Sequence, residues 1–111
     1  MKVDALCEKL NARVLCGTTD REFEGVYTGD LLSRAMSRVE ADNAWVTIMA
    51  NINVVAVANL TEPAVIVLAE DVVMQEDALG AAVENDLCVI SSPLSAYEIC
   101  CAIQKMAEEG S

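Results

Sequence analysis

The stretch Ala64-Val65-Ile66-Val67-Leu68-Ala69 decides the fold. It is a short run, apolar throughout and rich in β-branched side chains, which is typical of a strand that is covered on both faces. Such strands occur at the centre of parallel sheets, because the helices that connect parallel strands lie over both faces of the sheet. Residues 64–69 therefore predict an α/β fold with this strand in its middle.

The alternation of strand and helix continues on both sides of residues 64–69. Strands joined by helical crossovers lie parallel, with helices over both faces of the sheet. The sequence therefore predicts a three-layer α/β/α sandwich with a mostly parallel sheet of about five strands. The further predicted elements are strands over 44–49 and 87–90, a helix capped by Asn51 or Asn53 that runs through residue 60, a helix over 75–85, and a helix over 96–107 that follows a capping box of Ser95 and Glu98.

The first third of the chain is less regular. Its patterns predict a helix over 3–10, strands over 12–16 and 23–28, and a helix that opens at Gly29-Asp30 with Asp30 as its N-cap. Only a short segment joins the two strands, so the sequence does not determine their relative direction.

Length and composition indicate one compact domain over residues 1–111. Hydrophobic residues make up 54% of the chain and charged residues 23%, a balance that excludes intrinsic disorder. The apolar runs are shorter than the roughly 18 residues that cross a bilayer. The N-terminal sequence does not resemble a secretory leader, so we expect a cytoplasmic protein.

The charge balance excludes two classes of partner. Eighteen acidic residues against seven basic ones give a net charge of −11. Nucleic-acid binding proteins displace phosphate counterions with basic faces, and an anionic membrane surface would repel this chain. We therefore expect neither nucleic acid nor membrane as a partner. Histidine, the commonest general base and metal ligand, is absent from the sequence.

The five cysteines are most simply interpreted as reduced thiols that fill the core. Their number is odd and no C-x-x-C pair occurs, which disfavours a disulfide framework. A redox or cluster role has no spacing signal but stays open as an alternative. The cysteines are Cys7, Cys16, Cys88, Cys100 and Cys101.

Polar and glycine residues follow every predicted strand. Ligands of open α/β sheets bind beyond the carboxyl ends of the strands, so we expect a small-metabolite or nucleotide site there. The same residue types also cap helices and form turns, and for Arg21 an ion pair with Asp20 or Asp30 is the structural alternative. The candidate ligand-binding residues are Asp20, Arg21, Gly25, Gly29, Asp30, Asn51, Asn53, Ser91, Ser92 and Ser95.

Motifs of catalysis are missing from the sequence. It contains no phosphate-binding loop of the G-x-x-x-x-G-K-[ST] type, no G-x-G-x-x-G and no G-x-S-x-G. Without histidine, a Ser–His or Cys–His nucleophile pair is excluded. We predict no catalytic residue, no metal site and no cofactor.

The segment from Asp20 to Ser33 resembles the signature of the DRTGG domain. Asp20, Arg21, Gly25 and Gly29 match its characteristic positions, and Glu24 stands where the family has Thr. Residues 44–48, 53–58 and 92–98 extend the resemblance over nearly the whole chain.

The resemblance implies a fold and a role. The family is similar to the N-terminal domain of HPr kinase/phosphorylase, an α/β/α layer structure also related to a MurF-type N-terminal domain. It occurs beside CBS domains in regulated pyrophosphatases and in phosphotransacetylase-like enzymes. Stand-alone copies occur in anaerobic bacteria, some encoded near iron-only hydrogenase subunits. The kinase chemistry of the namesake resides in a separate phosphate-loop domain, which this chain lacks.

Three hypotheses for function follow. The first is a non-catalytic regulatory or protein-interaction module, expected to be a homodimer, with a protein partner enzyme or a small-molecule ligand. Its dimer contact would use Tyr27, Trp45 or Met49, although a core position is the alternative for each. The second is a redox or iron–sulfur accessory protein of a hydrogenase-type complex. The third is a small enzyme that uses acidic residues and a divalent ion.

Overall fold

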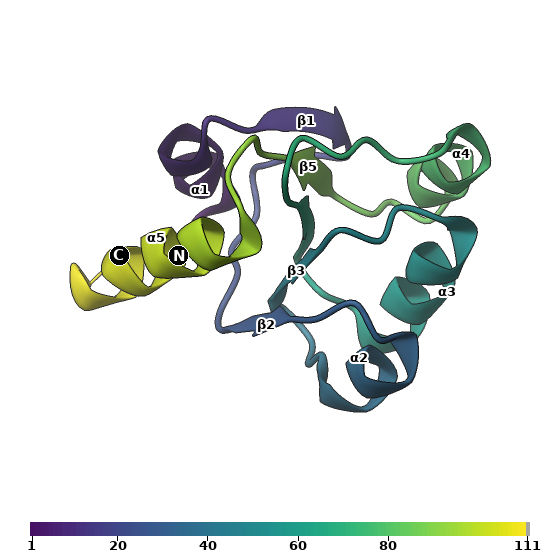
Figure 1. Ribbon diagram of the computed structural model, residues 1–111, viewed down its shortest axis with the longest axis horizontal. Coiled ribbons are helices and arrows are strands. Elements are labelled where there is room, and N and C mark those ends of the chain that lie inside the picture. Colours follow the sequence, from purple (N-terminus) through teal and green to yellow (C-terminus); the bar gives the residue numbers. More distant parts are fainter. Residues whose placement is uncertain (111) are drawn as a thin grey trace.

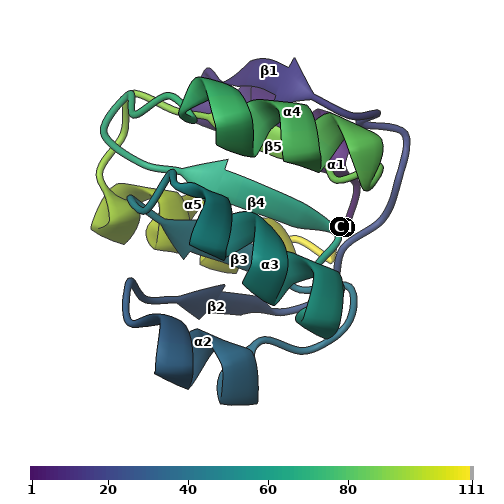
Figure 2. The same cartoon turned by 90° about the vertical axis from the view of Figure 1, so that its right-hand side faces the viewer.

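The computed structural model of the chain describes residues 1–110 and contains a five-stranded sheet in the order β1-β5-β4-β3-β2. The strands are β1 (Arg13–Cys16), β2 (Val26–Thr28), β3 (Ala44–Thr47), β4 (Val65–Leu68) and β5 (Val89–Ser91). The helices are α1 (Val3–Leu10), α2 (Leu32–Arg38), α3 (Ile52–Thr61), α4 (Glu76–Glu84) and α5 (Ala96–Glu108). Helices α1 and α5 cover one face of the sheet, and α2, α3 and α4 cover the other (Figures 1 and 2). The predicted α/β sandwich with helices on both sides of a mostly parallel sheet is confirmed.

Strand β4 occupies the middle of the sheet, as its sequence predicts. All four of its residues are buried, and it pairs in parallel with β3 on one side and β5 on the other. Successive side chains of a strand point to opposite faces. Accordingly, Val65 and Val67 belong to the core beneath α1 and α5, whereas Ile66 and Leu68 belong to the core beneath α2, α3 and α4.

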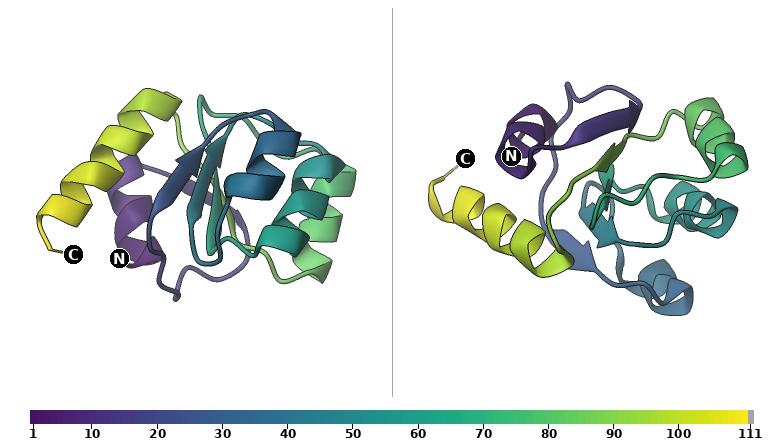
Figure 3. Two further views of the ribbon diagram at one scale, coloured as in Figure 1. Left: turned by 90° about the horizontal axis from the view of Figure 1, so that it is seen from below. Right: turned by 45° about the horizontal axis from the view of Figure 1, so that its top comes forward.

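Strand β1 runs against the other four strands. It pairs antiparallel with β5, while β2, β3, β4 and β5 are mutually parallel where they pair. The carboxyl end of β1 therefore points away from the carboxyl ends of the other four strands. The chain then crosses to the far edge of the sheet and begins β2 (Figure 3). The direction that the sequence left open is thus settled.

Two predicted features of the first third are wrong in detail. The strand expected over 23–28 contains only Val26–Thr28, because Phe23 instead packs fully buried in the core beneath α1 and α5. Asp30 is not an N-cap, since α2 begins at Leu32 and its capping residue, Leu31, makes no side-chain capping bond. The Asp30 carboxylate instead accepts hydrogen bonds from Thr47 and Ile48 at the end of β3.

Among residues 1–110, no helix combines the length and the apolar character that crossing a membrane requires.

Candidate functional site

The sheet has two edges at which loops gather. We call the end where β2, β3, β4 and β5 finish the carboxyl edge, and the opposite end, where they begin, the amino edge. In Figure 2 the carboxyl edge lies on the left, where the connections that lead into α2, α3, α4 and α5 emerge. The loop that follows β1 lies at the amino edge, because β1 is antiparallel to β5.

Gly29 and Asp30 fasten the loop after β2 to the end of β3. The Asp30 Oδ1 atom accepts hydrogen bonds from Thr47 Oγ1 at 2.7 Å and from the Ile48 amide at 2.9 Å. The Gly29 carbonyl accepts a bond from Trp45 Nε1 at 3.1 Å. Both candidate residues thus hold two neighbouring loops of the carboxyl edge in a fixed relation.

Asn51 and Asn53 lie at the start of α3. Asn51 is the N-cap, and its Oδ1 atom accepts from the Asn53 amide at 3.0 Å, which confirms one of the two predicted caps. Asn53 stands in the first turn with its side chain exposed. Of this pair, Asn53 is therefore the one whose amide faces solvent at the carboxyl edge.

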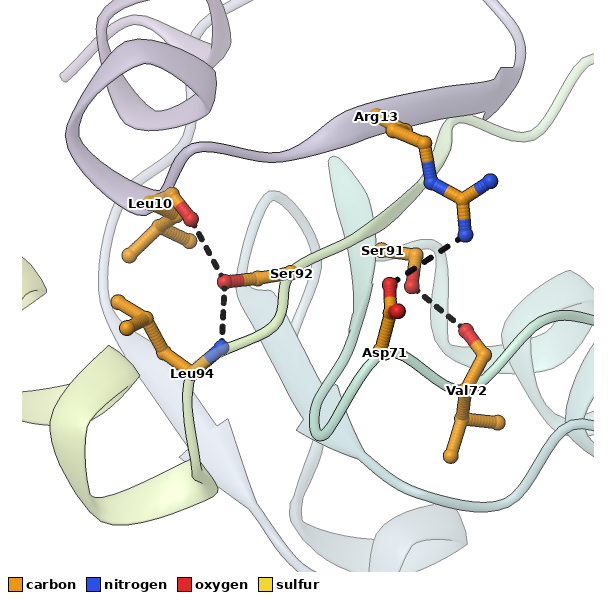
Figure 4. Close-up of polar contacts among 7 residues, drawn as sticks. All are labelled: Leu10, Arg13, Asp71, Val72, Ser91, Ser92 and Leu94. Atoms are coloured by element: carbon orange, nitrogen blue, oxygen red, sulfur yellow. Dashed lines mark hydrogen bonds and ion pairs between the residues drawn. The ribbon is translucent and has the colours of Figure 1, made fainter.

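Ser91 and Ser92 are fully buried and serve the fold (Figure 4). The Ser91 hydroxyl donates to the Val72 carbonyl at 2.6 Å. The Ser92 hydroxyl donates to the Leu10 carbonyl at 2.7 Å and accepts from the Leu94 amide at 3.2 Å. Each hydroxyl is 0% exposed and engaged with backbone, so neither presents a hydrogen-bonding atom to a ligand in this conformation.

Ser95 caps α5 as predicted. Its hydroxyl accepts from the Glu98 amide at 3.2 Å, and the Glu98 carboxylate accepts from the Ser95 amide at 3.0 Å. The hydrogen bond from the Ser95 backbone is the main reason that the pKa of Glu98 lies below its ordinary value. Ser95 and Glu98 thus form the predicted capping box.

The turn after β4 locks onto the loop after β5. Glu70 and Asp71 both adopt positive φ, 58° and 61°, a conformation that costs non-glycine residues energy. Their amides donate to the Leu94 and Ser92 carbonyls at 2.8 Å each. The Asp71 carboxylate also lies 3.4 Å from the Arg13 guanidinium (Figure 4). These contacts hold the strained turn in place.

Asp20, Arg21 and Gly25 do not join the other candidate residues. Arg21 lines a hollow of about 360 Å³ together with residues of the turns that precede β3, β4 and β5, which places it at the amino edge. Gly25 directly precedes β2, and its carbonyl accepts from the Ala44 amide at 3.0 Å. The single rim expected from the sequence is therefore divided, because that expectation placed the end of β1 beside the ends of strands to which it is antiparallel.

The expected ion pair of Arg21 with Asp20 or Asp30 is not formed. The Arg21 guanidinium donates to the carbonyl and the hydroxyl of Thr18, at 2.9 and 3.1 Å. Asp20 lies instead 3.7 Å from the Lys2 ammonium. Arg21 thus stabilises the turn after β1, and its ligand-binding role stays a prediction.

The amino edge carries acidic residues around its hollows. Asp42, Glu62 and Asp86 each adopt positive φ in the turns before β3, β4 and β5. Glu22 and Asp42 line both the 360 Å³ hollow and a second one of about 490 Å³. Acidic side chains therefore predominate around both hollows, and Arg21 is a positively charged residue that lines the 360 Å³ hollow.

The carboxyl edge displays apolar side chains that the sequence analysis missed. Leu31, Ile48, Ile52 and Tyr97 fall within predicted strands or helices, and Val73 falls between a predicted strand and a predicted helix, yet each lies in a loop or in a first helical turn. The signal that could have identified them is an apolar residue in the connection that follows a strand, where capping and turn-forming residues are usual. The side chains are Leu31 (63% exposed), Ile48 (45%), Ile52 (40%), Val73 (54%) and Tyr97 (78%), and we call this set the apolar strip.

The core interpretation is confirmed for Cys88, which is buried, whereas Cys7, Cys16 and Cys100 are partly buried and pack against the core from its margin. Burial raises the pKa of Cys7, Cys16 and Cys100, and it raises that of Cys88 to about 11. A raised pKa lowers the thiolate fraction and with it the reactivity toward oxidants and metals. Cys101 is exposed. Within residues 1–110, no three Cys, Asp or Glu side chains are arranged to hold a metal ion.

No family model and no curated protein matches the chain. Among solved structures, it is similar to the crystal structure of the CBS and DRTGG domains of the regulatory region of Clostridium perfringens pyrophosphatase, complexed with its activator diadenosine tetraphosphate. The TM-score is 0.77 at 13% identity, over 92% of this chain and 45% of that chain. The likeness supports a DRTGG-like fold, and the neighbour is a regulatory region rather than a catalytic one.

Proposed function

We propose that the chain is a non-catalytic regulatory or protein-interaction module that binds its ligand, a small metabolite or nucleotide, at the carboxyl edge. The fold likeness supports a regulatory role, because the similar region regulates a pyrophosphatase and binds a nucleotide activator. The sequence lacks the motifs of phosphate-loop and triad enzymes, which agrees with a non-catalytic role. The cytoplasmic location stays a prediction.

The apolar strip is the observation that carries this proposal. It lies where ligands of open α/β sheets bind, beyond the carboxyl ends of parallel strands. The exposed aromatic ring of Tyr97 and the exposed amide of Asn53 offer the stacking surface and the polar group that a nucleobase uses. Exposed Glu70 and Glu76 at the same edge disfavour a free polyphosphate. A nucleoside or its monophosphate is thus the preferred ligand class.

Thermal unfolding in the presence of adenosine, AMP, ATP and Mg²⁺-ATP tests the proposal. A ligand that binds only the folded chain raises the apparent Tm. We expect adenosine and AMP to raise it, ATP to raise it less, and Mg²⁺ to restore part of the loss with ATP. Tyr97→Ala should remove the effect, whereas Val83→Ala, an exposed apolar residue far along α4, should keep it.

Two results would contradict the proposal. One is an unchanged Tm with all four compounds at millimolar concentration, together with no heat of binding by calorimetry. The other is hydrolysis of ATP by the purified chain alone, which would make it an enzyme. Each result is independent of the oligomeric state.

We also propose that the chain forms a homodimer, as expected from the sequence. Trp45 is fully buried, so its core alternative is confirmed, while Tyr27 and Met49 are partly buried and pack against the same core. Light scattering coupled to size exclusion should give twice the monomer mass. A monomer mass across micromolar concentrations would exclude the dimer without affecting the ligand proposal.

A further inference from the structure

The residues of the apolar strip are distributed over four consecutive connections of the carboxyl edge. Half of the ten large apolar side chains that are exposed among residues 1–110 belong to it. Leu31 follows β2, Ile48 and Ile52 flank the loop after β3, Val73 follows β4, and Tyr97 follows β5. Neighbouring strands lie about 4.8 Å apart, so β2 and β5 are separated by roughly 15 Å. Five exposed apolar side chains distributed over that distance exceed what one nucleoside covers.

The loops that carry the strip are held in place before any partner binds. The Asp30 carboxylate joins the loops after β2 and β3. The amides of Glu70 and Asp71 join the loops after β4 and β5. Because these backbones are already ordered, docking onto the strip loses little conformational entropy. A fixed apolar display of this kind is typical of a protein-binding surface.

Acidic residues surround the strip. Basic residues at this edge are fewer: Arg34 in α2, Lys9 in the last turn of α1, and Arg13, which lies within 4 Å of Asp71. The surrounding field is therefore negative, and a partner with Lys and Arg around its contact would be attracted and oriented. A second copy would bring two acidic edges together, so this surface disfavours a homodimer contact. The exposed acids are Asp30, Glu70, Asp71, Glu76, Asp77 and Glu98.

We propose that the carboxyl edge docks onto a protein whose contact surface has an apolar centre surrounded by Lys and Arg. The inference rests on the proposed function only in taking this edge as the recognition surface. Nucleoside binding and protein docking would then share Tyr97, so that a bound ligand at one end of the strip modulates attachment of the partner.

A pair of matched amphipathic helical peptides tests the inference. Both carry the same leucine face, one with a lysine polar face and the other with a glutamate polar face. Fluorescence anisotropy with the intact chain should show that the lysine peptide binds at least about tenfold more tightly than the glutamate peptide, and that its affinity falls as salt rises.

Two double variants separate docking on the strip from general attraction to an acidic protein. Leu31→Ser with Val73→Ser removes two strip residues and should weaken binding of the lysine peptide about tenfold. Leu60→Ser with Val83→Ser removes two apolar residues of similar or greater exposure from the far ends of α3 and α4 and should leave binding within about twofold. Circular dichroism confirms that both variants fold.

The inference is overturned if the two peptides bind equally, or if the Leu31 and Val73 variant binds like the parent. Equal weakening by the Leu60 and Val83 variant would overturn it as well. If these results occur while adenosine still raises the Tm, the partner inference alone is lost. If adenosine also fails, the carboxyl edge is not a recognition surface and both proposals are wrong.

Discussion

The two edges of the sheet contain similar residues and differ in which side chains they leave exposed. At the carboxyl edge, Asp30, Ser91 and Ser92 form hydrogen bonds with neighbouring backbone and hydroxyl groups, and apolar side chains face solvent among the exposed acids. At the amino edge, Asp42 and Glu62 keep their carboxylates exposed around acidic hollows. The comparison teaches that a polar loop is not by itself a binding loop. What remains exposed after the fold has used its polar groups indicates where recognition occurs.

The largest effect is expected where β1 meets the amino edge. Gly17 has φ +85°, and a Cβ atom there would lie 2.4 Å from the Leu87 carbonyl oxygen and 2.6 Å from the Cys88 Cα atom. Gly17→Ala should lower the free energy of unfolding by about 3 kcal/mol, since strain and overpacking add. Urea unfolding followed by fluorescence of the single, buried Trp45 measures the change. Gly80→Ala, with open space around its Cβ, is the control and should stabilise α4 slightly.

The buried hydroxyl of Ser92 gives the next largest effect and lies at the carboxyl edge. Ser92→Ala leaves the Leu10 carbonyl and the Leu94 amide without their partner, which should cost about 2 kcal/mol. The exposed Ser33→Ala should change the unfolding free energy by less than about 0.5 kcal/mol. Equal effects from the two serines would mean that Ser92 does not hold the edge together.

Asp30 and Asp20 offer a direct contrast between the edges, because both are candidate ligand residues. Asp30→Ala removes two hydrogen bonds from the end of β3 and should cost about 1.5 kcal/mol. Asp20→Ala removes an exposed ion pair of 3.7 Å and should cost less than about 0.5 kcal/mol. Chemical denaturation of both variants measures the two losses in unfolding free energy. A larger loss for Asp20→Ala would contradict the structural role assigned to Asp30 at the carboxyl edge.

A smaller effect than that of Asp30→Ala is expected at the capping box at the start of α5. Ser95→Ala should cost about 1 kcal/mol. Because the folded chain holds the pKa of Glu98 below its ordinary value of 4.5, this carboxylate stabilises the fold above that value, and the contribution is lost as pH falls through the lowered pKa. Denaturation at pH 7 and below pH 4 should show a smaller penalty for Ser95→Ala in acid. If Ser95→Ala lowers the free energy of unfolding equally at both pH values, the reciprocal hydrogen bonds between Ser95 and Glu98 are excluded.

Most of the fold could be predicted from local patterns, and the exceptions have physical causes. The apolar run at residues 64–69 and the capping box at Ser95 depend on near neighbours in the chain, so their signals are local. The direction of β1 depends on pairing with β5, more than seventy residues away, and the short segment around Gly17 contains no signal for it. That one pairing places Asp20 and Arg21 at the amino edge, whereas Gly25 lies there because β2 begins only at Val26.

The candidate site was predicted less well than the fold. Asp30 was assigned to capping its own helix, but its carboxylate bonds to Thr47 and Ile48 across the sheet, a choice that only tertiary packing determines. Ser91 and Ser92 have the composition of a ligand loop, yet both point into the protein. Exposed Val73 and Ile48 indicate the recognition surface better than the polar candidates do. Polar residues in loops are explained by capping and turn formation, but exposed apolar residues in loops have no such structural role.

Amide chemical-shift mapping with adenosine tests the central claim most directly. The account predicts that titration shifts amides at residues 29–31, 48–53, 70–74 and 94–98, the connections of the carboxyl edge (Figure 2). Shifts confined to residues 21–25, 42, 59–64 and 85–87, around the acidic hollows of the amino edge, would contradict it.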